Sequence, residues 1–174
     1  MKQLFRNAIL SATLLLGLVS TGLAQGPMGK DFGIGLTLGE PTGVTARFWL
    51  SKQNSWDLAA GASYLGNPHI QAGYLWHYNQ AFNSRIVSIY LGVGGILGFG
   101  EKGKVVIINR RKVDSWYFDD GNDGLLVAAR GVAGLQIIPR NTPLDIYLEL
   151  NPILGLTPDV GFDALVAVGI RFYP

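Results

Sequence analysis

The sequence predicts an all-β protein, in which eight antiparallel strands run up and down and close into a β-barrel. Apolar residues alternate with small or polar ones through most of the chain after residue 24, and a period of two is that of a strand. Turn-forming residues interrupt this alternation seven times, which leaves eight segments. No long window has the 3.6-residue period of a helix. Such a meander closes most simply as an up-and-down barrel, because closure removes the two edges.

The composition sets the class of protein and excludes several others. A chain of 174 residues is expected to form one domain, and 48% apolar residues exclude a disordered protein. The chain has no Cys, which excludes a disulfide scaffold, thiolate zinc sites and cysteine nucleophiles. Lys2 and Arg6 lie in an N-terminal segment that we expect to be removed, as argued below, and without them the basic residues equal the 12 acidic ones in number. Nothing therefore favours a nucleic acid partner.

Residues 1–24 have the pattern of a secretory signal peptide. Lys2 and Arg6 precede an uncharged apolar stretch from Ala8 to Val19, and small or polar residues follow up to Ala24. The alternative, an N-terminal membrane anchor, needs about 20 continuous apolar residues. The apolar stretch of this chain, Ala8 to Val19, has only 12. We therefore predict a signal peptide over 1–24 and a mature barrel domain over 25–174 that begins at Gln25.

The first two strands form a predicted hairpin. In Asp31–Gly39 the side chains of Phe32, Ile34, Leu36 and Leu38 share one face. The turn Glu40–Gly43 has Pro at its second position and Gly at its fourth, which is typical of a type I turn. The alternation then resumes over Val44–Leu50.

Six further strands follow with the same alternation. They are expected at Ser55–Tyr64, His69–Tyr78, Ile86–Leu97, Gly124–Ile137, Leu144–Gly155 and Gly161–Tyr173. The segments between them are Ser51–Asn54, Leu65–Pro68, Asn79–Arg85, Gly98–Asp123, Ile138–Pro143 and Leu156–Val160. Most of the strands are close to the nine to eleven residues, roughly, that a tilted strand needs to cross a bilayer.

The face opposite the large apolar side chains is made mainly of glycine and alanine, which form a poor solubilising surface. Its small residues are Gly33, Gly35, Gly61, Gly73, Gly92, Gly94, Gly134 and Gly169, with Ala59, Ala128 and Ala167. They suit the inside of a narrow barrel, where they leave room for Arg47, Arg130, Tyr90, Tyr147 and Arg171. Four apolar residues, Trp49, Leu75, Ile96 and Leu165, also fall on this inner face. The other face is then expected to meet lipid, which makes the barrel a transmembrane one.

Aromatic residues on the apolar face support this orientation. Trp56, Tyr64, Tyr74, Trp76, Tyr78 and Phe172 lie on it, several of them near strand ends. Membrane barrels carry aromatic girdles at these positions. The sequence thus predicts a bacterial outer-membrane barrel, and a secreted or periplasmic soluble barrel that binds a ligand stays open as an alternative.

With its C-terminal strand Phe162–Phe172, the mature chain resembles the small OmpA/OmpX-like outer-membrane barrels. The resemblance implies outer-membrane lipid and lipopolysaccharide as surroundings. It also implies that the barrel-assembly machinery reads an aromatic residue at the end of the last strand, and Phe172 matches that residue. This chain continues past it with Tyr173 and Pro174.

Motifs for cofactors and catalysis are weak. The glycine run Gly92–Gly100 lacks the spacing of a dinucleotide loop. A calcium loop that starts at Asp119 has the required glycine at Gly124 but needs a glutamate at position 130, where Arg130 stands. We therefore expect no cofactor and no metal. Only His69 and His77 could act as bases near neutral pH. Because Ser63 and His69 flank one short turn, a small barrel enzyme that modifies lipid A, a hydrolase or acyltransferase, stays an alternative, but we predict no catalytic residue.

Isolated charges inside the predicted strands need partners in a narrow lumen. From the strand directions we expect three pairs: Arg47 with Asp57, Asp145 with Arg171, and Arg130 with Glu149. Structural ion pairs that fill the lumen are the main interpretation, and a proton or ion path is the alternative.

A barrel this narrow is not expected to be a general diffusion porin. Any activity is therefore expected on the one long segment, Gly98–Asp123, which should emerge on the extracellular side. Its basic and aromatic residues are Lys104, Arg110, Arg111, Trp116, Tyr117 and Phe118. Long loops of this composition often bind partners. We expect a structural or surface-interaction role with an unknown extracellular partner.

Overall fold

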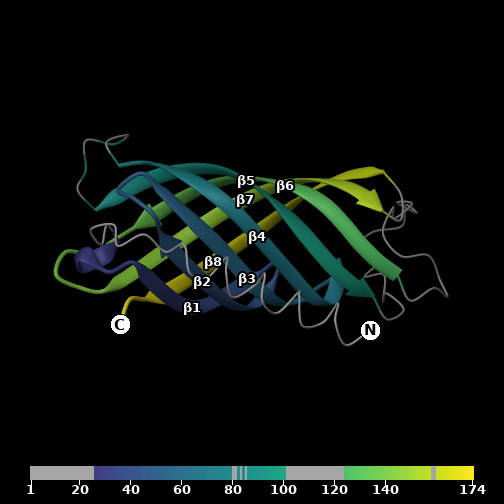
Figure 1. Ribbon diagram of the computed structural model, residues 1–174, viewed down its shortest axis with the longest axis horizontal. Helices are drawn as coiled ribbons and strands as arrows, with labels where there is room; N and C mark the ends of the chain where they lie inside the picture. Colours follow the sequence, from purple (N-terminus) through teal and green to yellow (C-terminus); the bar gives the residue numbers. More distant parts are fainter. Residues whose placement is uncertain (1–25, 80–81, 83, 85, 101–123, 158–159) are drawn as a thin grey trace, which may run out of the picture.

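A computed structural model describes residues 26–79, 82, 84, 86–100, 124–157 and 160–174. In this part of the chain, eight antiparallel strands close into one barrel, as the alternation predicts (Figure 1). The predicted signal peptide, its cleavage site at Gln25 and the segment 101–123 lie outside the described residues. No helix among the described residues is long and apolar enough to cross a membrane.

The strands follow one another around the barrel in chain order. They are β1 (Phe32–Gly39), β2 (Thr42–Trp49), β3 (Asn54–Ser63), β4 (Gly66–Tyr78), β5 (Val87–Gly100), β6 (Gly124–Ile137), β7 (Leu144–Thr157) and β8 (Gly161–Phe172), with the short 3-10 helix η1 (Pro27–Gly29) before them. β1 closes the barrel by pairing with β8. The C-terminus lies near η1, at one end of the barrel (Figure 1).

The two ends of the barrel differ in what they carry. The terminal end, as we call it, carries η1, the C-terminus and the connections β2–β3, β4–β5 and β6–β7. The distal end carries the connections β1–β2, β3–β4, β5–β6 and β7–β8.

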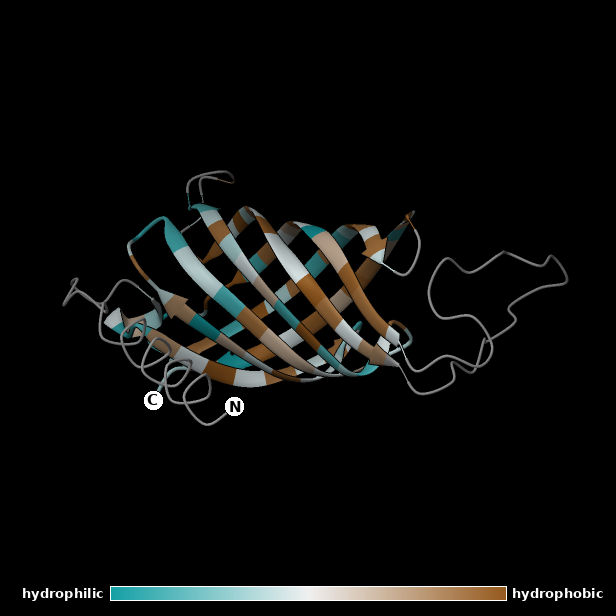
Figure 2. Cartoon of the chain, turned by 45° about the vertical axis from the view of Figure 1, so that its right-hand side comes forward, coloured by the Kyte–Doolittle hydropathy of each residue, from teal (hydrophilic) through white to brown (hydrophobic). Residues whose placement is uncertain are grey.

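The outer wall of the barrel is apolar. Leu36 is paired with Val44 on one side and with Ile170 on the other, and the three side chains are 61%, 53% and 43% exposed. Apolar and polar residues alternate along each strand in Figure 2. Large apolar side chains are exposed on every strand, including Ile34, Phe48, Leu58, Ile70, Leu91, Val93, Leu125, Leu148, Leu150, Val166 and Val168.

The inner wall is buried and divides into two zones. Near the distal end an apolar cluster fills the lumen, made of Leu65, Ile96, Leu126, Ala128, Ile153 and Leu165. Toward the terminal end the buried side chains are mostly polar or charged. The four apolar residues expected inside, Trp49, Leu75, Ile96 and Leu165, are all buried.

Inward glycines make room for aromatic rings on neighbouring strands. Gly134 is paired with Tyr90 and Gly169 with Tyr147. A Cβ added at either glycine would overlap the ring of its partner. At these two positions, a large side chain of the next strand therefore covers an inward glycine.

The β6–β7 ladder is interrupted at mid-height. The register runs through Arg130↔Ile153 and resumes at Ala133↔Leu150, without pairs at the two positions between them. Pro152 lies in this gap, and proline has no N–H to donate to a ladder. Its ring leans over β6, since a Cβ on Gly131 would lie 3.1 Å from the Pro152 Cγ.

Candidate functional site

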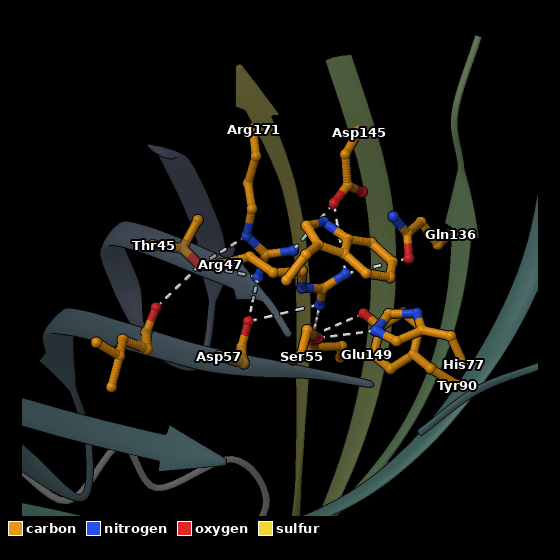
Figure 3. Close-up of polar contacts among 12 residues, drawn as sticks. Thr45, Arg47, Ser55, Asp57, His77, Tyr90, Gln136, Asp145, Glu149 and Arg171 are labelled. Carbon is orange, nitrogen blue, oxygen red and sulfur yellow. Dashed lines mark hydrogen bonds and ion pairs between the residues drawn. The ribbon is translucent and has the colours of Figure 1, made fainter. Parts of the chain in front are cut away.

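The six charged residues singled out from the sequence all lie in the lumen. Arg47 comes from β2, Asp57 from β3, Arg130 from β6, Asp145 and Glu149 from β7, and Arg171 from β8. None of them is more than 2% exposed. Three guanidinium groups and three carboxyl groups thus share one buried space, and Figure 3 shows two of the guanidinium groups, those of Arg47 and Arg171, among the carboxyl groups. Such a cluster is stable only when the charges pair with one another.

Asp57 is the centre of this lumen network. Its Oδ1 lies 2.6 Å from Arg171 Nη2 and 3.5 Å from Arg47 Nη2, and its Oδ2 lies 3.3 Å from Arg130 Nη2. One carboxylate therefore bridges arginines from three different strands. Because these strands are spread around the barrel wall, the bridge ties opposite sides of the barrel together.

The two carboxyl groups of β7 complete the ion pairs. Asp145 Oδ2 lies 3.4 Å from Arg47 Nη1 and 3.5 Å from Arg171 Nη1, and it accepts a hydrogen bond of 3.1 Å from the Tyr173 hydroxyl. Glu149 Oε1 lies 3.5 Å from Arg47 Nη2 and accepts a 2.6 Å hydrogen bond from the Tyr90 hydroxyl. Arg47 thus contacts all three carboxylates.

Neutral groups hold the arginines in place. Thr45 Oγ1 accepts hydrogen bonds from Arg171 Nε at 3.1 Å and Nη2 at 2.8 Å, while its own hydroxyl donates to the Leu58 carbonyl. Gln136 Oε1 accepts from Arg47 Nη1 at 3.1 Å. The guanidinium of Arg171 lies 3.8 Å from the centre of the Tyr147 ring, a cation–π distance.

An aromatic layer closes the network toward the terminal end. The Trp49 indole donates to the Tyr173 hydroxyl at 3.1 Å, and its ring lies 4.2 Å from that of His77. His77 Nε2 in turn lies 2.8 Å from Ser55 Oγ. Since Tyr173 also contacts Asp145, this layer is continuous with the charged residues.

The structure corrects one of the three expected pairs. Arg47 is in register with Asp57, and Asp145 with Arg171, each at an ion-pair distance of 3.5 Å. Arg130 and Glu149 do not pair with each other: Arg130 is in register with Ile153, and Glu149 with Gly134. Four residues of offset along adjacent strands are too many for the two side chains to meet, so Arg130 reaches across the lumen to Asp57 instead.

Part of the polar surface of the lumen has no protein partner. Arg130 Nε and Nη1, both polar atoms of the Asn151 amide and His69 Nδ1 are buried without a hydrogen bond among the described residues. Buried polar groups of this kind commonly bind ordered water.

Among the described residues, no hydrogen bond joins Ser63 and His69, the two residues of the enzyme alternative. His69 is fully buried in the lumen, with its Nε2 3.5 Å from Gln71 Oε1. Ser63 Oγ accepts the backbone N–H of Leu65 instead. The described residues also hold no group of three or more His, Asp or Glu side chains placed to bind a metal.

The distal rim holds a smaller polar cluster. The Tyr64 hydroxyl donates to Asp163 Oδ2 at 2.9 Å, which links the β3–β4 turn to β8. Burial raises the pKa of Glu40, in the β1–β2 turn, against the opposing effect of hydrogen bonds from Ser63 and Tyr64. This cluster therefore joins two of the four connections around the rim to the first residues of β8.

The remaining predicted residues are placed only in part. Phe172 is 49% exposed on the outer wall, at the end of β8, and pairs with Ile34 and Leu144. The residues of the predicted interaction segment, Lys104, Arg110, Arg111, Trp116, Tyr117 and Phe118, lie outside the described residues. Sequence reasoning missed Thr45, Tyr90 and Gln136 as network members, although their inward position follows from the alternation.

Comparisons with descriptions of protein families, with curated proteins and with solved structures each found no match. The function must therefore be inferred from the barrel, its two faces and the lumen network. These features are sufficient to compare a membrane barrel with a soluble one.

Proposed function

We propose that this chain is an integral bacterial outer-membrane β-barrel with a structural or surface-interaction role. One observation carries the proposal: large apolar side chains cover the outside of the barrel, while six charged side chains are buried inside it. A soluble barrel has the opposite arrangement, because an apolar outer wall of this extent would cause aggregation in water. In a membrane, the outer wall meets hydrocarbon.

The aromatic side chains of the outer wall support the same environment. Trp56, Trp76, Tyr78 and Phe172 are between 41% and 50% exposed, and all four lie toward the terminal end of their strands. At the distal end Tyr64, Phe99 and Phe162 are exposed. Aromatic residues at both ends of an apolar belt are typical of proteins that cross a bilayer, because their rings favour the interface.

The filled lumen argues against a role in solute diffusion. Arg47, Arg171 and Tyr90 occupy its terminal half and are fully buried, and the apolar cluster around Leu126 and Ile153 occupies its distal half. An eight-stranded barrel has an interior about wide enough for its own side chains. We therefore assign no porin activity to the barrel.

The interaction role rests on the segment between β5 and β6. The two strands pair up to Gly100↔Gly124, so residues 101–123 connect them at the distal end. With the termini on the periplasmic side, this end is extracellular. In this proposal, Phe172 is the signal for the barrel-assembly machinery, and lipopolysaccharide surrounds the distal end.

Fractionation and gel migration test the proposal. We expect the protein in the outer-membrane fraction of a sucrose gradient, and we expect unheated samples to migrate differently from boiled ones, because a closed barrel resists detergent. N-terminal sequencing should begin at Gln25. Recovery in the soluble periplasm without detergent would contradict the membrane assignment and favour the soluble ligand-binding alternative.

A further inference from the structure

A hollow of about 730 Å³ lies at the terminal end of the barrel. It is lined by the β2–β3 turn and by the ends of β3, β4 and β5, with Lys52, Gln53, Asn54, Trp76, Tyr78 and Ile89 among its residues. Trp76 and Tyr78 project from the outer wall, where they are 41% and 50% exposed. The hollow therefore opens where the apolar belt meets the polar turns.

Hydrogen bonds between turn and strand hold the shape of this hollow. The Asn79 amide donates to the Lys52 carbonyl at 2.8 Å, and the His77 backbone N–H donates to the Gln53 carbonyl at 2.7 Å. Within the turn, Ser51 Oγ accepts the backbone N–H groups of Gln53 and Asn54. A ligand would thus enter a hollow that is already formed, which lowers the entropic cost of binding.

The lining combines one positive charge with hydrogen-bond donors. Among the described residues that line the hollow, Lys52 is the single charged one, and none carries a carboxylate. The Trp76 indole N–H and the Tyr78 hydroxyl have no hydrogen-bond partner among the described residues. A cation beside two free donors is complementary to a phosphate or another anion with several oxygen atoms.

The surroundings of the hollow are apolar on the side toward mid-membrane. Trp76 packs edge-on against Tyr74 at 5.2 Å, and Tyr74 packs against Trp56 at 5.4 Å, so an aromatic row runs from the hollow across β3 and β4. On β5, Ile89 and the exposed Leu91 continue the apolar wall. The fitting ligand is therefore amphipathic, with an anionic head and hydrocarbon chains.

We propose that this hollow binds the headgroup of a membrane glycerophospholipid. Lys52 contacts the phosphate, Trp76 and Tyr78 donate to phosphate or ester oxygens, and the acyl chains lie along Ile89 and Leu91. The proposal rests on the membrane location proposed above. It goes beyond general contact with lipid because it assigns one preferred lipid to one place on the barrel wall.

Native mass spectrometry of the folded barrel tests the site. The full mature chain in non-ionic detergent is titrated with phosphatidylglycerol, and the apparent affinity for the first bound lipid is measured. We expect Lys52→Gln to weaken that affinity about fivefold, the effect of one lysine at a lipid surface. Trp76→Phe keeps an aromatic side chain but removes the indole N–H donor, and it should also weaken binding.

Matched variants and ligands separate this site from general lipid contact. Lys30→Gln removes another exposed lysine at the terminal end, and Trp56→Phe alters another exposed tryptophan of the same wall. Both should bind within about twofold of the unchanged protein, since neither residue lines the hollow. Diacylglycerol, which has no phosphate, should bind weakly, and so should glycerol phosphate, which has no chains.

The outcomes distinguish the two proposals. If the barrel inserts into bilayers but Lys52→Gln and Lys30→Gln behave alike, the headgroup site is wrong and the membrane assignment stands. Equal binding of diacylglycerol would show that the phosphate is not recognised, and equal binding of glycerol phosphate would show a free phosphate site. A chain that fails to enter bilayers would overturn the headgroup site together with the membrane assignment.

Discussion

Arg171 Nη2 lies 2.6 Å from Asp57 Oδ1, although 114 positions separate the two residues in the chain. β8 contributes the arginine and β3 the aspartate, and β1 and β2 lie between these strands in the barrel. The ion pair therefore crosses the lumen and does not follow the ladder. Together with the ion pairs from Arg47 and Arg130, it makes Asp57 the one carboxylate among the described residues that pairs with arginines of three other strands.

We expect Asp57→Asn to destabilise the barrel strongly. The change leaves three buried guanidinium groups with one carboxylate fewer, and stranding a buried charge costs about 3 to 5 kcal/mol. The free energy of unfolding can be measured by urea titration in lipid vesicles, with gel migration as the signal. Asp163→Asn, at the distal rim, is the control and should cost less than about 1 kcal/mol. Similar losses in the two variants would contradict the central place of Asp57.

A double-mutant cycle should distinguish the partners of Arg130. Because Arg130 Nη2 contacts Asp57, the losses from Arg130→Met and Asp57→Asn should differ from additivity by about 1 kcal/mol or more. The cycle of Arg130→Met with Glu149→Gln should be nearer to additive, since no ion pair joins these residues. Strong coupling in the second cycle and none in the first would restore the pairing expected from the sequence.

The alternation predicted which side chains enter the lumen, but the partners of each charge needed the structure. A period of two assigns each residue to a face, so the six charged residues and even the apolar exceptions such as Leu165 were placed inside. Contacts across the lumen depend on the stagger of all eight strands, and a local pattern does not contain that stagger. Arg130 shows the difference: its strand and face were predictable, whereas its partner on β3 was not.

The orientation of the faces predicts that a charge on the outer wall destabilises the barrel. Leu148 is 50% exposed on the outer wall of β7, so Leu148→Arg should destabilise the barrel in a bilayer by about 2 to 4 kcal/mol if it lies near the midplane. Arg140→Leu, in the β6–β7 connection at the terminal end, is the control, and the same unfolding assay should detect little change. A silent Leu148→Arg variant would favour the soluble barrel.

The glycine–aromatic packing predicts a sharp difference between adjacent residues of β6. Gly134→Ala places a methyl group in the ring of Tyr90, and overpacking of this kind costs about 1 to 3 kcal/mol. Ala133 faces the outer wall, where Ala133→Val adds volume without a neighbour inside the lumen, and its effect should stay within about 0.5 kcal/mol. Thermal unfolding in detergent compares the two variants. A larger loss from Ala133→Val would show that these two faces are reversed.

The segment between β5 and β6 should be dispensable for the barrel. The β5–β6 ladder is complete up to Gly100↔Gly124, so both strands have their pairing without residues 104–120. Deleting those residues should therefore preserve heat-modifiable migration, while any surface interaction that depends on Lys104, Arg110 or Trp116 is lost.

In intact cells, a protease that cuts after arginine should cleave at Arg110 or Arg111, because the distal end is extracellular in the proposed orientation. The two fragments should stay together in the membrane, since the strand ladder holds them. Cleavage only after lysis would instead place the distal end in the periplasm, and a deletion that prevents assembly would show that the segment contributes to folding.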